Sequence, residues 1–281
     1  MPFYKIFKSN LRSVINSSRA INFSYFCPMI SMIVLGSGNV AQHLITAFLK
    51  SETVTLVQVF ARDASKINHL IDNEKITTDY LTIKKADIYV IAVSDNAIAE
   101  VSNQLPFKNR FVVHTSGSMP MTVLNEKNNR GVFYPLQTFT KNKALHFKEI
   151  PICLESEEVS DYQMLEQVAK SISEFPYSIS SDQRKALHVA AVFVCNFVNH
   201  LYTQGQAICN ANDVPFSILQ PLLIETASKI QTLTPEEAQT GPAKRNDTET
   251  INAHLSFLKD KNQQEIYKLL TKSILDHGKK L

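Results

Sequence analysis

Hydrophobic and polar positions follow two patterns in the first two thirds of the chain, and only one of them continues afterwards. Short apolar and β-branched runs, such as Ile33–Leu35 and Asp87–Val93, predict strands that are covered on both faces. Segments with apolar residues at helical spacing, such as Gln42–Lys50 and Ala97–Leu105, predict helices between them. Because strand and helix take turns, we predict an α/β fold with a doubly wound, parallel Rossmann sheet.

The strand pattern stops near Ser181, and the rest of the chain shows helical spacing almost throughout. We therefore predict three parts: an extension at 1–31, a Rossmann dinucleotide-binding domain at 32–180 and an all-helical domain at 181–281. Asp182 is placed to cap the first helix of the last part.

The extension is basic and contains no acidic residue. Such a composition resembles an organelle transit peptide. The alternative is a start codon placed too early, since Met29 and Met32 stand beside the first strand, and we favour this alternative. In either case we expect the segment to add nothing to the core.

Charge and cysteine content exclude several classes of protein. The chain has 29 basic and 26 acidic residues, and the basic excess lies in the extension. The rest of the chain therefore has no excess of positive charge that would indicate binding to nucleic acid or to a membrane surface. No apolar run approaches the roughly 20 residues that span a bilayer. The cysteines have no C-x-x-C or metal-ligand spacing, which predicts buried, reduced thiols in a cytoplasmic protein without a metal site. They are Cys27, Cys153, Cys195 and Cys209.

The first predicted strand runs directly into a G-x-G-x-x-A turn and then a helix. In dinucleotide-binding turns the first Gly makes the bend, the second lets the backbone approach a pyrophosphate, and the third small residue, here Ala41, allows close packing. The helix N-terminus then faces the phosphates with unpaired N–H groups. The alternative is an ordinary strand-to-helix turn. The predicted cofactor contacts are Gly36, Ser37, Gly38, Asn39 and Val40.

The end of the second predicted strand, Thr53–Phe60, bears on the identity of the cofactor. Sites specific for NAD place an acid there to hold the ribose 2′-hydroxyl, whereas an Arg nearby accommodates the 2′-phosphate of NADP. Phe60 occupies the usual place of the acid and Arg62 follows, so we predict NADP rather than NAD. Asp63 could cap the next helix through Lys66 and Ile67, or could itself face a ribose.

Two later strand ends supply further candidates, because ligands of open α/β sheets lie outside the carboxyl ends of the strands. Val93 and Ser94 are predicted beside the cofactor, although Ser94 or Asp95 could also simply cap the following helix. Ser116 and Gly117 are predicted to contact the substrate, since a Gly among hydroxyls permits close backbone approach. The alternative is that these residues simply form a turn, where Ser and Gly are common.

The long helix predicted from Asp182 to about Ala211 is apolar on most sides and should be buried in a bundle or an interface. One stripe holds mostly uncharged polar residues, which favours a cleft wall or an interface over plain solvent. Its members are Lys185, His188, Asn196, Asn199, Thr203, Gln206 and Asn210. We assign proton transfer to His188 and substrate orientation to Asn196, with Lys185 as a second possible acid. The alternative for His188 is a structural role.

The last candidate, Arg245, follows a structural motif. Thr234 to Glu237 form a capping box with Pro at the first helical position. Arg245 could clamp a carboxylate or phosphate of the substrate in bidentate fashion, or could be held by Asp247, which is predicted to cap the next helix.

Several motifs together resemble a bacterial family that joins a Rossmann-like domain to an all-helical domain of unknown function. The motifs are Gly36–Ala41, His114–Ser118, Tyr134–Phe139, His188–Phe197, and Thr240–Pro242 with Arg245 and Asp247. The resemblance extends to the 6-phosphogluconate dehydrogenase superfamily, including pyrroline-5-carboxylate reductase and deazaflavin-dependent NADP reductase. It implies NADP as cofactor, a helical domain that forms a homodimer, and a substrate cleft between domains. The chain departs from the family pattern at Leu187, often Tyr, at Tyr134, often His, and at Asn246, often Gly.

These observations lead to one hypothesis with one alternative. The hypothesis is an NADP-dependent oxidoreductase that transfers hydride to or from a carbonyl or imine of a small-molecule substrate. The alternative is a non-catalytic NADP(H)-binding protein that senses redox state or regulates a partner.

Overall fold

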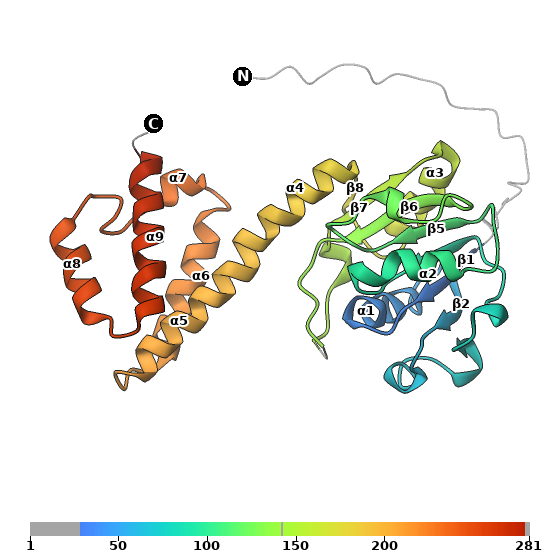
Figure 1. Cartoon of the computed structure of the whole chain (residues 1–281), viewed down its shortest axis with the longest axis horizontal. Helices are drawn as coiled ribbons and strands as arrows, with labels where there is room; N and C mark the ends of the chain where they lie inside the picture. The colour runs from blue at the N-terminus through green and yellow to red at the C-terminus, as the bar shows by residue number, and fades with distance from the viewer. Residues whose placement is uncertain (1–28, 142, 279–281) are drawn as a thin grey trace, which may run out of the picture. The chain divides into compact units, whose positions relative to one another are not determined.

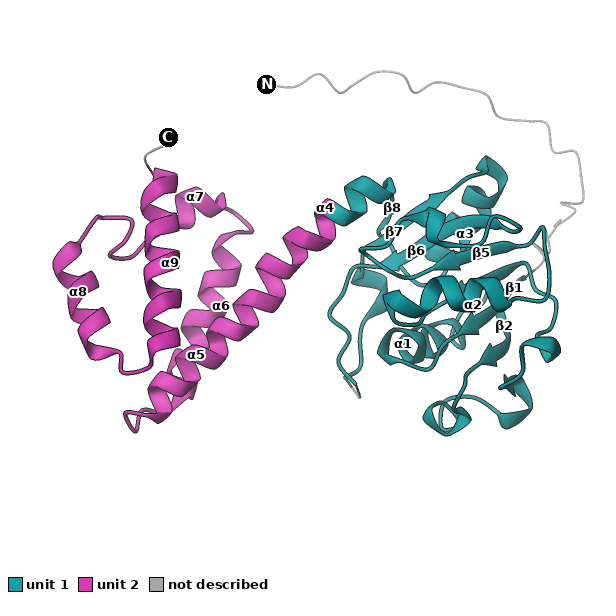
Figure 2. Cartoon of the chain, in the orientation of Figure 1, with its two compact units in different colours: residues 1–185 teal, residues 186–281 magenta. Residues whose placement is uncertain are grey.

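A computed structural model describes residues 29–141 and 143–278. The predictions about the extension and Cys27 therefore fall almost entirely outside the described residues. The chain divides into two compact units, residues 1–185 and 186–281 (Figure 2). The division falls within the helix that begins at Ser181.

In the first unit the described strands form one eight-stranded sheet in the order β3-β2-β1-β4-β5-β6-β7-β8 (Figure 1). The strands are β1 Ile30–Leu35, β2 Val54–Phe60, β3 Ile76–Thr77, β4 Ile88–Ile91, β5 Phe111–His114, β6 Asn129–Pro135, β7 Ile152–Ser156 and β8 Pro176–Ser178. The strand order reverses between β1 and β4, which is the point where doubly wound sheets bind their ligands. The predicted Rossmann-like fold is confirmed.

Helices cover both faces of this sheet because successive strand residues point to opposite sides. Met32 and Val34 of β1 belong to one core cluster, together with α1 Asn39–Phe48 and α3 Val159–Lys170. Ile33 belongs to the other cluster, with α2 Ile98–Gln104. The alternation places the carboxyl edge of the sheet between two packed layers, where the site is built.

One strand pair departs from the predicted parallel arrangement, because β6 and β7 run antiparallel. The connection between them, residues 136–151, contains only a short 3-10 turn, Phe147–Glu149, among its described residues. A parallel pair needs a crossover connection, usually a helix, whereas an antiparallel pair does not. The lack of a helix does not by itself set the direction, because the connection from β5 to β6, residues 115–128, also contains only a 3-10 turn and that pair is parallel.

The second unit is helical. A continuous helix spans Ser181–Asn210 and consists of α4 Ser181–Ala191, a π-helical turn and α5 Val198–Asn210. It is followed by α6 Gln220–Lys229, α7 Pro235–Ala238, α8 Thr248–Phe257 and α9 Lys261–Gly278. The predicted capping box at Thr234 and Glu237 is confirmed.

The start of α4 differs in detail from the prediction, because Ser180 caps the helix in place of Asp182. Ser180 Oγ accepts a hydrogen bond from the Gln183 N–H (3.3 Å), and the Ser180 N–H donates to Gln183 Oε1 (2.9 Å). This reciprocal arrangement satisfies two backbone donors at once. A lone Asp182 cap could not provide the second of these bonds.

The predicted burial of the long helix is not found within a single chain. Phe193, Val194 and Phe197 are 63%, 67% and 51% exposed, and Cys195 is exposed as well, contrary to the prediction of buried thiols. Cys153 is buried as predicted, and burial raises the pKa of its thiol to about 11. The described residues therefore leave one side of this helix uncovered, where the sequence pattern predicts burial.

By length and composition alone, the helix Ser181–Asn210 could also cross a membrane. Sequence alone did not predict this property, because polar residues such as Asn196 and Asn199 interrupt the apolar run. A helix that packs against other apolar helices has the same composition.

Candidate functional site

A cavity of about 560 Å³ lies at the carboxyl ends of β1, β2 and β4 within the first unit. Its lining contains every residue predicted to bind the cofactor. These are Gly36, Ser37, Gly38, Asn39, Val40, Arg62, Val93 and Ser94. Parallel strands present their carboxyl ends at one edge, so residues far apart in sequence meet there.

Two glycines of the turn after β1 have different structural roles. Gly36 has φ of +145°, and a Cβ built on it would lie 2.1 Å from the carbonyl oxygen of Ala92. No L-residue fits there without moving β1 or the end of β4. At Gly38, by contrast, no described atom lies within 4 Å of such a Cβ. Gly36 is therefore required by the fold, whereas Gly38 leaves space for a ligand to approach the backbone.

The N-terminus of α1 opens into this cavity, and no described side chain caps it. The Asn39 side chain instead donates to the carbonyl of Phe139 (3.1 Å), and the Gln42 side chain donates to the carbonyl of Ser37 (2.9 Å). These bonds hold the turn in shape while leaving the helix terminus available to an anion. Uncapped backbone N–H groups and the helix dipole favour a phosphate at such a position. The residues thus fit the pyrophosphate of a dinucleotide.

The same cavity contains the residues that bear on the choice between NAD and NADP. Arg62 lines it, as do Asp63 and Lys66. Asp63 Oδ1 accepts hydrogen bonds from the Ser65 N–H (3.1 Å) and hydroxyl (2.6 Å), and the hydroxyl bond is the main cause of the lowered pKa of Asp63. Asp63 thus caps the next turn through Ser65, not through the predicted Lys66 and Ile67.

The sequence did not predict several other lining residues. Phe60 and Tyr80 place their ring centroids 4.2 Å apart, and Gln137 and Phe139 reach the cavity from the segment after β6. The resemblance had pointed to the motif Tyr134–Phe139 without giving a role to its residues. Only the tertiary fold places that segment beside the glycine turn.

Ser116 and Gly117 are buried and are not part of the cavity lining. Ser116 Oγ accepts hydrogen bonds from the N–H groups of Ser118 (3.1 Å) and Met119 (3.0 Å). The Ser118 hydroxyl donates to Asp95 Oδ2 (2.5 Å), so Asp95 holds this turn. These contacts match the turn interpretation, and the predicted substrate contact stays a prediction.

His114, at the end of β5, is fully buried. Its Nδ1 accepts a hydrogen bond from the Ser116 N–H (3.1 Å), so Nε2 carries the proton and donates to the carbonyl of Pro120 (3.3 Å). Burial, with a smaller contribution from the positive charge of Arg184, lowers the pKa of His114 to about 4. His114 is therefore a neutral structural group at physiological pH.

We expect acid to destabilise the first unit through His114. The folded pKa is about 4 against 6.5 for the ordinary side chain, so the unfolded chain binds the proton first. The contribution is complete above pH 6.5 and is lost as the pH falls towards 4, which amounts to about 2 kcal/mol between pH 7 and 4.5. Urea denaturation at both pH values measures it. His114→Asn should remove this part of the pH dependence, and an unchanged dependence would assign the effect to other groups.

The remaining predicted residues, His188, Asn196 and Arg245, lie in the second unit. His188 is half-buried on α4, and Asn196 is exposed within the π-helical turn Val192–Phe197. A π turn is frequent at functional sites. It also offsets residues after it by about one position, so the predicted polar stripe does not run straight from His188 to Asn199.

Arg245 is exposed, and no described carboxylate lies within 4.0 Å of its guanidinium, so it is not held by an ion pair with Asp247. Asp247 caps α8 as predicted, with Oδ1 accepting from the Thr250 N–H (3.0 Å). Asn246 has φ of +52°, which Asn tolerates. The loop thus presents Arg245 to a ligand or to solvent.

Two family models match the chain. Residues 31–117 match NADP oxidoreductases described as coenzyme F420-dependent, and residues 150–274 match a domain of unknown function, DUF2520. No curated protein matches the sequence.

Solved structures resemble this chain over most of its length. A protein from Bacteroides fragilis, described as a candidate NADP oxidoreductase, is 36% identical with a TM-score of 0.80, over 88% of this chain and 98% of that one. An imine reductase variant from Myxococcus stipitatus in complex with NAD⁺ is 16% identical with a TM-score of 0.62, over 89% of this chain and 98% of that one. A reductive aminase from Aspergillus terreus in complex with NADPH and ethyl levulinate is 14% identical with a TM-score of 0.65, over 89% of this chain and 95% of that one. The last two show a shared fold.

Proposed function

We propose that this chain uses NADP(H) to transfer hydride to or from a carbonyl or imine of a small metabolite. The chain belongs to a family of NAD(P)-dependent oxidoreductases. Members of this family join an NADP oxidoreductase domain of the coenzyme F420-dependent type to a DUF2520 domain. The observation that carries the proposal is the cavity at the carboxyl edge of the sheet. It combines an uncapped helix N-terminus, a glycine turn open at Gly38 and a cation at Arg62. Each of these features suits a phosphorylated dinucleotide.

The chain's own residues would bind and orient the reactants. The turn Gly36–Val40 would hold the pyrophosphate, and Arg62 the 2′-phosphate. His188 would give or take the proton at the substrate oxygen or nitrogen, Asn196 and Ser116 would orient the substrate, and Arg245 would anchor an acidic group. The nicotinamide cofactor supplies the hydride when it is bound. The imine reductase and the reductive aminase among the similar structures support imines as substrates beside carbonyl compounds.

Arg62 provides the test of cofactor choice. We expect Arg62→Ala to weaken NADPH binding by roughly 10-fold to 100-fold, because a charge-assisted contact to the 2′-phosphate is lost. NADH binding should change little. Cofactor fluorescence measures both affinities, and Arg110→Ala, outside the cavity, is the matched control. Equal binding of NADH and NADPH to the unaltered protein would contradict the assignment to NADP.

His188 provides the test of catalysis. We expect the protein to oxidise NADPH with a member of a panel of oxo acids, aldehydes and cyclic imines. His188→Ala should lower the turnover number by roughly 100-fold or more while leaving NADPH affinity unchanged. Unchanged turnover would assign His188 a structural role. Binding of NADPH without turnover of any panel member would favour the redox-sensing alternative.

A homodimer through the helical unit is the second part of the proposal. The exposed side chains of this unit include many large apolar groups, and monomeric proteins rarely leave such surface uncovered. They include Val189, Phe193, Val194, Phe197, Leu222, Ile224 and Leu269. A second copy of the chain would cover them. Sedimentation velocity should give the mass of a dimer, whereas a monomer that partitions into lipid vesicles would contradict it.

A further inference from the structure

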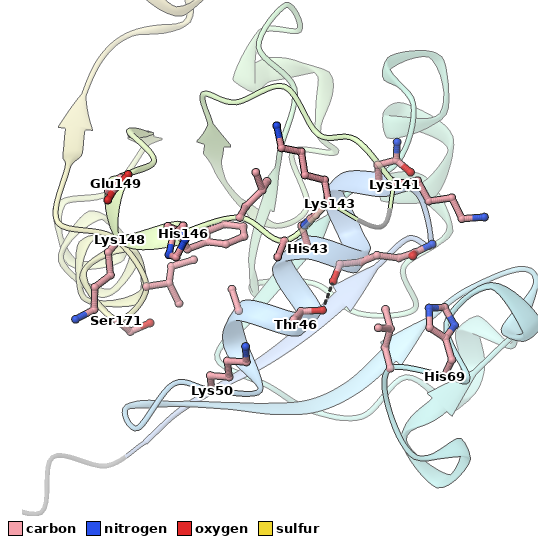
Figure 3. A pocket seen from close by; sticks show the side chains of 18 residues that line it. His43, Thr46, Lys50, His69, Lys141, Lys143, His146, Lys148, Glu149 and Ser171 are labelled. Atoms are coloured by element: carbon pink, nitrogen blue, oxygen red, sulfur yellow. Dashed lines mark hydrogen bonds between the residues drawn. The ribbon is translucent and has the colours of Figure 1, made fainter.

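A second cavity in the first unit, of about 650 Å³, lies along the outer side of α1 (Figure 3). The helix residues that line it recur at helical spacing and form one face of α1. They are Asn39, Gln42, His43, Thr46 and Ala47, and Lys50 lines the cavity from the turn just after the helix. The opposite face, which includes Leu44, Ile45 and Phe48, packs in the core. Asn39, at the first turn of α1, also lines the first cavity, whereas Lys50 lies beyond the other end of the helix.

The facing wall of this cavity consists of residues 141 and 143–149, and the residues just before them are held close to α1. The Nε2 atom of His43 lies 3.1 Å from the carbonyl oxygen of Thr140, and the His43 and Phe139 ring centroids are 5.3 Å apart. His69 and Leu70 close a third side. The walls therefore come from segments that are far apart in the sequence but are connected by specific contacts.

The rim of the cavity is strongly basic. Four lysines from two segments line it, together with the imidazoles of His43, His69 and His146. The lysines are Lys50, Lys141, Lys143 and Lys148. No carboxylate in the described part of the chain lies within 4.0 Å of their ammonium groups, and Glu149 is the one acid in the lining. By contrast, Lys170 on α3 is paired with Glu166 at 2.9 Å.

The floor of the cavity is apolar. Leu70 and Phe147 pack against the core, and Ile172 is 7% exposed. Ligand sites typically combine an apolar surface with a few polar groups and have volumes of roughly 300 to 1,000 Å³. Lysine binds phosphate as a point charge on a flexible stem, so lysines on a rim can adjust to several phosphates.

We propose that this cavity binds a nucleoside di- or triphosphate, at a site separate from that of the dinucleotide. The base contacts the apolar floor beside Phe147, and the phosphates contact Lys50, Lys141, Lys143 and Lys148. The unneutralised charge favours a ligand with several negative charges, and the volume suits a mononucleotide. The inference does not rest on the proposed oxidoreductase activity.

The test is isothermal titration calorimetry of the full chain with ATP and, separately, with inorganic tripolyphosphate. We expect ATP to bind, and the variant Lys50→Gln with Lys148→Gln to bind it roughly 10-fold or more weakly. All four positions in the two double variants are exposed, so folding should persist, and circular dichroism checks this. The matched control is Lys108→Gln with Lys170→Gln, which removes the same charge outside the cavity and should leave ATP affinity unchanged.

A further variant separates the two cavities. Arg62→Ala alters only the first cavity and should not change ATP binding. Loss of ATP binding in Arg62→Ala with no loss in the Lys50 and Lys148 variant would place ATP in the dinucleotide cavity and overturn the proposal. Equal loss in the control variant would reduce the effect to general charge and overturn it too. Tripolyphosphate binding as tight as that of ATP would overturn the role of the apolar floor, and absence of binding by both probes at millimolar concentration would overturn the site.

Discussion

Gly36→Ala should destabilise the first unit by about 3 to 5 kcal/mol, as the sum of a strained backbone and a steric overlap. The backbone angle φ of +145° disfavours any L-residue, and the added methyl group would lie 2.1 Å from the Ala92 carbonyl oxygen. Relief requires β1 and the end of β4 to separate, which breaks the hydrogen bond from the Ala92 N–H to the Leu35 carbonyl. Urea denaturation followed by circular dichroism measures the loss.

Gly38→Ala is the matched control, because it adds the same methyl group two residues away. No described atom lies within 4 Å of the added Cβ, and the backbone there is extended. We expect stability to change by less than about 1 kcal/mol. NADPH affinity should nevertheless fall by roughly 10-fold or more, since the methyl group occupies the approach of the pyrophosphate. Unchanged affinity would show that phosphate does not dock at this turn.

Arg184→Met should cost about 3 kcal/mol of stability, because it leaves one partner of a buried ion pair without the other. Arg184 is 1% exposed. Its Nη1 donates to Glu155 Oε2 (2.5 Å), and its Nη2 donates to the carbonyl of Met119 (2.6 Å). These bonds fasten the first turn of α4 to β7 and to the turn after β5. The surface pair Arg130 and Glu157 gives a control, and Arg130→Met should cost less than about 1 kcal/mol.

The double variant Arg184→Met with Glu155→Gln tests the physical cause. Among the described residues, Arg184 Nε is the one buried side-chain polar atom without a hydrogen-bond partner, so burial of the guanidinium is not fully compensated. Removing both charges together should therefore restore about half of the loss or more. A double variant as unstable as the two single changes added together would show that the charges do not interact.

The residues predicted to bind the cofactor could be identified from the sequence, because the features that define this cavity are local in the chain. A glycine turn between a strand and a helix is defined by a few adjacent residues, and the topology of parallel strands then brings Arg62 and Ser94 to the same edge. The predicted residues of this cavity were therefore found together. The roles given to them remain predictions.

Features that depend on distant partners could not be predicted in this way. On the sequence, Arg184 is a cation on a helix, and nothing shows that Glu155, 29 residues earlier, lies beside it. The antiparallel pairing of β6 and β7 was not predicted, because the sequence of the loop between them shows no periodicity that would indicate the direction of β7 relative to β6. The exposure of Phe193 was missed because burial depends on what covers the helix.

The basic cavity beside α1 could not be predicted from the sequence for a related reason. Lys50 ends a predicted helix and Lys148 lies outside the predicted helices, and each alone is an ordinary solvated charge. These two lysines line the same cavity only because contacts hold residues 139–140 against α1.

The π turn determines how the two halves of the long helix face, because it accommodates one residue more than a regular α-helix would. Deleting one residue between Val192 and Phe197 would let the chain close a regular α-helix there. The residues beyond the deletion would then keep nearly the facing they have now, because the π turn already accommodates one extra residue. Closing the turn into a regular α-helix with all its residues kept would instead rotate Asn199 and Thr203 by about 100° about the helix axis relative to His188, because each residue of an α-helix advances by that angle.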